Sequence, residues 1–127
     1  MRIGELAAEV GTTTRTLRFY EQIGLLDARR SANGYRDYDQ RDVRLVREIL
    51  DLQAVGFALE ETRPFVECLR AGNATGDSCP DSIAVYRRKL AEVDSLLDRM
   101  RELRGELADK LTEACARRCG LCQTPAP

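Results

Sequence analysis

IGELAAEVGTTTRTLRFYEQIGLL (residues 3–26) and RRSANGYRDY (residues 29–38) are the stretches that decide the fold of this 127-residue chain. Apolar side chains recur at helical spacing before Gly11, and the threonines at 12–14 can cap a second helix that ends near Gly24. The pair Asn33-Gly34 favours a tight hairpin, because a type I′ turn needs positive φ at both positions. Helix, turn, helix and a two-stranded wing make a winged helix-turn-helix, a structure that reads duplex DNA.

The arginines of this region are placed as a DNA-binding surface requires. Arg15 and Arg18 lie three residues apart, so they share a helix face that differs from the face of Leu17. The formal net charge of the whole chain is -1, which excludes a polybasic nucleic-acid binder. Residues 1–47 nevertheless carry nine Arg against seven acids, a balance of 9 − 7 = +2. A modest local excess is sufficient when the arginines share one face.

Composition restricts the remaining classes of function. No stretch approaches the roughly 18 apolar residues of a membrane span, and acids interrupt the first ten residues, so we expect a cytoplasmic protein. Five cysteines in a reducing compartment favour thiolates for metal or redox work over structural disulfides. The chain has no His, no phosphate-binding glycine loop and no base–nucleophile pair, so we do not expect an enzyme.

Beyond the wing, the sequence predicts three further helices. Asp39 can cap a third helix that ends at Gly56, and a fourth runs over about residues 59–69, where Pro64 should kink it or delay its start. A long helix begins at Pro80. Apolar residues follow it at heptad spacing and, after a slip, continue further: Ile83, Tyr86, Leu90, Val93, Leu97, Met100, Leu103, Leu107 and Leu111.

A helix with such a stripe cannot bury the stripe by itself, so it needs a partner, most simply the same helix of a second subunit. We therefore expect a mostly α protein with four parts. Residues 1–70 form the winged helix-turn-helix DNA-binding domain, and 71–79 form a linker. Residues 80–114 form the dimerisation helix, and 115–127 form a cysteine loop and tail that bind the effector.

The motifs IGELA, TTRTLRFYEQIGLL, NGYRDY and GFALEE, followed by the long terminal helix, resemble the MerR family of bacterial transcription regulators over nearly the whole chain. The resemblance implies a homodimer joined by an antiparallel coiled coil. It also implies a near-palindromic operator inside a promoter, and repression of that promoter by the apo form. Binding of the effector distorts the operator so that RNA polymerase can use the promoter.

The resemblance also assigns DNA-binding residues. Arg15 and Arg18 would contact base edges or phosphates from the recognition helix, and Arg36 on the wing would reach the flanking minor groove or its phosphates. Thr14 and Tyr20 would hold the phosphate backbone. Arg offers bidentate donors to guanine, and hydroxyl groups position the backbone, so the residue types agree with these roles. We expect Tyr35 to pack the wing on the core, and Tyr38 both to pack and to contact DNA.

Four cysteines bracket the long helix. A helix rises about 1.5 Å per residue, so Cys79 and Cys115 are separated by roughly 50 Å and cannot share an ion within one chain. In an antiparallel dimer the start of one helix lies beside the end of the other. Cys79 of one subunit can then join Cys115, Cys119 and Cys122 of the other in a composite site that occurs twice per dimer.

Thiolates bind soft ions such as Zn, Cd, Hg, Pb or Cu(I). Family members that sense divalent ions have a cysteine at the position of Cys79, whereas copper and gold sensors carry Ser there, so the resemblance favours a divalent ion. The family's first loop cysteine usually lies one residue earlier, where this chain has Ala114. Arg117 and Arg118 would lower the pKa values of the neighbouring thiols.

Two other hypotheses remain open from the sequence. The chain could be a redox or electrophile sensor in which Cys119 and Cys122 oxidise, or an architectural protein that dimerises and binds DNA without an effector. An iron–sulfur sensor of the same family would need Cys79 or another ligand besides the three C-terminal cysteines. Cys68 lies on an apolar helix face and is typical of a small buried hydrophobic residue.

Overall fold

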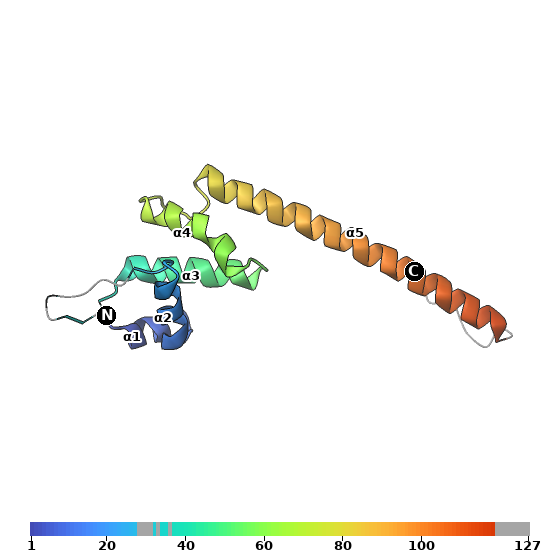
Figure 1. The fold of residues 1–127 in the computed structure, drawn as a ribbon, viewed down its shortest axis with the longest axis horizontal. Coiled ribbons are helices and arrows are strands. Elements are labelled where there is room, and N and C mark those ends of the chain that lie inside the picture. Colours follow the sequence, from blue (N-terminus) through green and yellow to red (C-terminus); the bar gives the residue numbers. More distant parts are fainter. Residues whose placement is uncertain (28–31, 33, 36, 119–127) are drawn as a thin grey trace. The chain divides into compact units, whose positions relative to one another are not determined.

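The computed structural model describes residues 1–27, 32, 34–35 and 37–118 (Figure 1). Regular structure in these residues is helical, and none of them lies in a strand. The elements are α1 (Ile3–Val10), α2 (Thr14–Gln22), α3 (Gln40–Ala54), a short 3₁₀ helix η1 (Leu59–Thr62), α4 (Arg63–Arg70) and α5 (Pro80–Arg117). The chain divides into two compact units, Met1–Tyr86 and Arg87–Pro127, and each is described by itself.

The helix-turn-helix begins and ends where its capping residues require. Gly11 ends α1 with φ +78°, in the left-handed region that favours glycine, and its N–H donates to Ala7 O at 3.0 Å. Thr13 caps the start of α2, because its hydroxyl accepts a hydrogen bond from the backbone N–H of Thr16 at 3.2 Å. The predicted pair of helices is confirmed, and the threonine that caps the second one is Thr13.

The starts of the next two helices also follow from the sequence. The Asp39 carboxylate caps α3. The backbone N–H of Asp39 donates to the Asp42 carboxylate at 2.9 Å, which completes a capping box. Pro64 lies in the first turn of α4, where its missing N–H has no helical partner to lose. The prediction that Pro64 delays the fourth helix is confirmed, since η1 occupies the residues immediately before α4.

The core of the first unit forms where α1, α2 and α3 meet. It consists of the buried residues Leu6, Ala7, Leu17, Tyr20, Leu25, Leu26, Tyr38, Val43, Leu45, Val46, Ile49 and Val66. The start of the chain is tied to the segment before α3, because Tyr38 N donates to Met1 O at 2.9 Å.

A second apolar cluster holds the first turns of α5 against α3 and α4. Phe57, Phe65 and Tyr86 pack edge to face, with centroids 5.0–5.9 Å apart. Gly76 lies in the linker before α5, where a Cβ would come within 2.8 Å of Glu48 Oε1 and 3.2 Å of Phe65 Cβ. At Gly76 the linker is therefore packed closely against side chains of α3 and α4.

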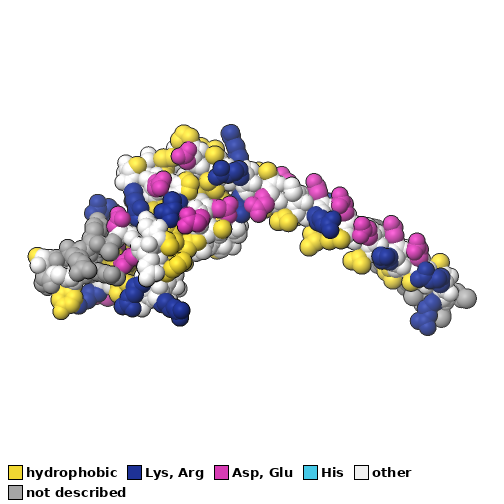
Figure 2. All heavy atoms as spheres, viewed as in Figure 1, with side chains coloured by type: hydrophobic (Ala, Val, Ile, Leu, Met, Phe, Trp, Pro, Cys, Tyr) yellow, Lys and Arg dark blue, Asp and Glu magenta, His cyan; other side chains and the backbone are white. Residues whose placement is uncertain are grey.

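In the second unit, α5 carries its apolar stripe in the open. The large hydrophobic residues between Leu90 and Leu111 are 36–67% exposed, and Figure 2 shows apolar side chains on the helix surface among charged ones. The helix continues to Arg117, so Cys115 lies in its last turn rather than in a loop that begins at residue 115. Within the described residues, no helix is both long and apolar enough to cross a membrane.

Candidate DNA interface and cysteine site

The second helix has one face in the core and one face in solvent. Leu17 is fully buried, and Arg15 and Arg18 are exposed. Thr14, the first residue of α2, is half-buried. Phe19 is also exposed, an apolar side chain beside the arginines that sequence reasoning passed over. This division of faces is what a helix needs if it is to enter the major groove of DNA.

The two tyrosines predicted to contact DNA lie in the core. Tyr20 is 3% exposed, and its hydroxyl donates to Gln53 Oε1 at 3.1 Å. Tyr38 is 2% exposed, and its hydroxyl donates to the Glu21 carboxylate. Both hydroxyl groups are bonded within the same unit, and burial raises the pKa of Tyr20. The structure shows both tyrosines packed in the core, and their contact with DNA stays a prediction.

The wing is described only in part. Arg29, Arg30, Asn33 and Arg36 lie outside the described residues. Tyr35 does not have the expected packing role, because it is 54% exposed. The guanidinium group of Arg2 lies over the Tyr35 ring, 4.1 Å from the ring centroid.

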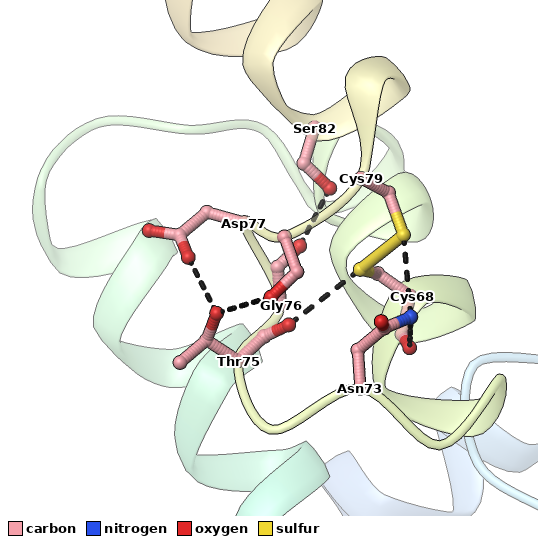
Figure 3. The surroundings of a disulfide bond; sticks show 8 residues. Cys68, Asn73, Thr75, Gly76, Asp77, Cys79 and Ser82 are labelled. Atoms are coloured by element: carbon pink, nitrogen blue, oxygen red, sulfur yellow. Dashed lines mark hydrogen bonds between the residues drawn. A yellow bond between two sulfur atoms is a disulfide. The ribbon is translucent and has the colours of Figure 1, made fainter.

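The cysteines divide into a described group and a group that is not described. Cys119 and Cys122 lie outside the described residues, and Cys115 is buried near the end of α5. Cys68 is buried as expected, but its sulfur is bonded to that of Cys79 in a disulfide, with 6.0 Å between the Cα atoms (Figure 3). This corrects the expectation of no disulfide. The pair escaped sequence reasoning because the linker, not helical periodicity, brings the two residues together.

Three acidic residues lie near one another where α3 faces the linker: Glu48 and Asp51 on α3, and Asp77 in the linker. Burial raises the pKa of the Glu48 carboxyl, and the negative charges of Asp77 and Asp51 raise it further. These groups line a cavity of about 380 Å³, together with Tyr86. The described residues include no group of three or more His, Cys, Asp or Glu side chains placed to hold a metal ion.

Comparison with known proteins agrees with this geometry. The family described as "MerR HTH family regulatory protein" matches residues 1–67, and "MerR, DNA binding" matches residues 43–110. The transcriptional regulator HmrR of Rhizobium leguminosarum bv. viciae is 34% identical over 115 residues, 91% of this chain and 86% of that protein. CueR of Escherichia coli O6:H1 is 34% identical over 119 residues, 91% and 83% of the two chains.

Solved structures give the same result. The regulator PbrR691 from Ralstonia metallidurans CH34, in complex with lead(II), aligns with a TM-score of 0.69 at 29% identity, over 100% of this chain and 91% of that one. HiNmlR bound to promoter DNA aligns with a TM-score of 0.57 at 23% identity, over 94% of each chain, which supports the fold alone.

The fold and the exposed arginine face define a DNA-binding transcriptional regulator, which is not a class of enzyme. Within that class, the chain belongs to the MerR family, as its sequence predicted.

The roles of Arg18 and Tyr20 can be separated by experiment. We expect Arg18→Ala to weaken binding to a duplex selected by this protein from a random library by about 1–3 kcal/mol, without loss of stability. We expect Tyr20→Phe to lower the free energy of unfolding by about 0.5–1.5 kcal/mol and to leave DNA affinity unchanged. Fluorescence anisotropy and urea denaturation measure the two quantities. Normal DNA affinity in Arg18→Ala would contradict the recognition face, and weakened binding by stable Tyr20→Phe would return this hydroxyl to the DNA interface.

The raised pKa of Glu48 predicts a pH-dependent stability. A group whose pKa is raised by folding favours the fold below its unfolded pKa, and this contribution disappears as pH rises through the folded pKa. We therefore expect Glu48→Gln to raise the melting temperature at pH 7 and to give a smaller difference near pH 4, where Glu48 is increasingly protonated. Glu106→Gln, on exposed α5, is the control that should show neither effect. A destabilised Glu48→Gln protein at pH 7 would contradict this prediction.

Proposed function

We propose that this chain is a transcription regulator that senses a thiophilic, divalent metal ion through cysteines of two subunits. The observation that carries the proposal is the joining of a helix-turn-helix to a 38-residue helix with Cys79 directly before its first residue and Cys115 in its last turn. The similarity to PbrR691, solved in complex with lead(II), supports a metal effector.

The proposed DNA interface consists of Thr14, Arg15 and Arg18 on the recognition helix and Arg36 on the wing. The helix arginines are exposed side by side, because Leu17 is buried beneath them. Arginine is suited to this surface, since its planar guanidinium group can bind both acceptors of guanine or a phosphate.

The proposed partner of α5 is the same helix of a second subunit. The apolar stripe between Leu90 and Leu111 is exposed in the single chain, so we expect a partner to bury it. Burying it against an identical helix gives each subunit the heptad seam that its sequence predicts. An antiparallel arrangement places the start of one helix beside the end of the other.

That arrangement brings together the donors of the proposed metal site, which are Cys79 of one subunit and Cys115, Cys119 and Cys122 of the other. The donor set fits a soft ion, because it is rich in sulfur and the chain contains no His. Zn, Cd, Hg and Pb fit it, and Cys79 favours these over Cu(I). Cys79 has to be reduced for this role, since only the thiolate binds metal.

The proposed response follows from the placement of the site. A metal ion held by both subunits would join the linker of one chain to the helix end of the other. The spacing of the two DNA-binding domains would then differ between the apo and metal-bound forms, and a switch needs such a difference between its two states. The apo dimer would repress, and the metal-bound dimer would distort the promoter for RNA polymerase.

The dimer helix can be tested with a pair of substitutions. We expect Leu97→Glu to convert the dimer to monomer, because it places a charge in the apolar seam. Ser95→Glu adds the same charge two residues away, at the heptad position furthest from the seam, and should remain dimeric. Sedimentation equilibrium of both variants measures the mass. A dimeric Leu97→Glu protein would contradict the proposed seam.

The metal site is tested by anaerobic titration of the reduced full chain with Zn(II), Cd(II), Hg(II) and Cu(I), following thiolate-to-metal charge-transfer absorbance. We expect saturation at one divalent ion per subunit. We expect Cys79→Ser to weaken this binding by more than about tenfold while leaving promoter DNA binding intact. Ser78→Ala is the neighbouring control and should bind metal normally. Featureless titrations with all four ions would contradict metal sensing.

A further inference from the structure

Cys68 and Cys79 come from two elements that the linker folds together. Cys68 lies on the buried face of α4 and is 2% exposed, whereas Cys79 is half-buried directly before α5. Their Cα atoms are 6.0 Å apart, within the range that a disulfide spans without backbone movement. Figure 3 shows the bonded sulfurs beside the linker residues Asn73 and Thr75.

The linker is held in place by hydrogen bonds that do not need the disulfide. Asn73 Nδ2 donates to Cys68 O at 2.9 Å and to Cys79 Sγ at 3.4 Å. Ser82 Oγ donates to Gly76 O at 2.5 Å, which fixes the far side of the loop. None of these contacts is made by the bond between the two sulfurs, so we expect them to keep the two sulfurs close together after reduction as well.

Hydrogen-bond partners also lie beside both sulfurs, for a thiol at Cys68 and for a thiolate at Cys79. Cys68 Sγ lies 3.5 Å from Thr75 O, where a thiol can donate a hydrogen bond. Cys79 Sγ accepts from the amide of Asn73, a contact that stabilises a thiolate. Cys79 is also the more exposed of the two, so it is the sulfur that an oxidant in solution reaches first.

We infer that Cys68 and Cys79 form a reversible thiol–disulfide pair that gives the regulator a second, oxidative input by withdrawing Cys79 from the metal site. This inference rests on the proposed function, in which Cys79 is a metal ligand. A sulfur in a disulfide carries no thiolate charge and therefore cannot bind the metal ion. Cys68 is the resolving cysteine and does not bind the ion.

The oxidant is a low-molecular-weight disulfide, RSSR. The Cys79 thiolate attacks one sulfur of RSSR, forms a mixed disulfide and releases one RS⁻. The Cys68 thiolate then attacks the Cys79 sulfur, forms the protein disulfide and releases the second RS⁻. Two electrons pass from the two cysteine sulfurs to RSSR, and the two cysteine protons end on the two released thiols. Excess thiol reverses both steps.

The first part of the experiment contains no metal and therefore does not depend on the proposed function. The reduced full chain is incubated with oxidised glutathione, alkylated and mapped by peptide mass spectrometry. We expect a peptide that links Cys68 to Cys79 and disappears with excess reduced glutathione. A mixture in which Cys79 is linked instead to Cys119 or Cys122, or remains reduced, would overturn the inference.

The second part measures Cd(II) binding before and after the same oxidation. We expect oxidation to weaken Cd(II) binding of the wild type by more than about tenfold. Cys68→Ser and Cys68→Ala have no resolving cysteine, so their Cys79 stops at the mixed disulfide. We expect reduced glutathione, at a concentration that leaves the wild-type pair oxidised, to restore their Cd(II) binding. Equal Cd(II) binding by wild type and variants at that concentration would overturn the gate, since the Cys68–Cys79 disulfide would then not control the loss of the ion.

Two further outcomes separate the claims. If reduced Cys68→Ser and Cys68→Ala both bind Cd(II) more weakly than the wild type, Cys68 is itself a ligand and the resolving role is wrong. If the linked peptide forms while Cys79→Ser binds Cd(II) normally, the proposed metal site fails and the gate fails with it, although the redox pair remains. If the linked peptide does not form while Cys79→Ser loses Cd(II), only the redox pair fails.

Discussion

Burial of one face of α2 is the constraint on which the DNA-binding unit depends. Leu17 is fully buried in the core cluster that also contains residues of α1 and α3, and full burial of a leucine contributes about 1.5–3 kcal/mol. Tyr20 adds a ring on the same face and a hydrogen bond to Gln53. Because this face is fixed in the core, the rotation of α2 about its axis is fixed as well. The buried face of α2 therefore directs Arg15 and Arg18 toward solvent.

The helices of this unit could be predicted from the sequence because their signals are local. Gly11 and Thr13 act on groups within a few residues, and the capping box joins Asp39 to Asp42, only three positions apart. Pro64 excludes itself from a helix interior and so marks the first turn of α4. The heptad stripe of α5 is also a local pattern, and the same residues are exposed in the structure. Fold class and family follow from such signals.

The roles of individual site residues were harder to predict, because they depend on partners that are far away in the sequence. Tyr20 bonds to Gln53, 33 residues away, and Tyr38 bonds to Glu21, 17 residues away. A tyrosine beside a DNA-binding motif looks the same in sequence whether its hydroxyl faces a phosphate or an amide. Cys68 is a similar case, since its helix face predicts burial but not the sulfur that the linker brings to it.

Cys79 is the residue in which the two proposed inputs meet, and their coupling follows from its single sulfur. The sulfur cannot be bonded to Cys68 and to a metal ion at the same time, so each state excludes the other. If only a fraction of the chains is reduced, the apparent Kd for the metal is the intrinsic Kd divided by that fraction. Bound metal in turn protects Cys79 from oxidation to the same extent. An oxidised cell would therefore require more metal for the same response, and a metal-loaded regulator would resist oxidation, without a second sensor domain.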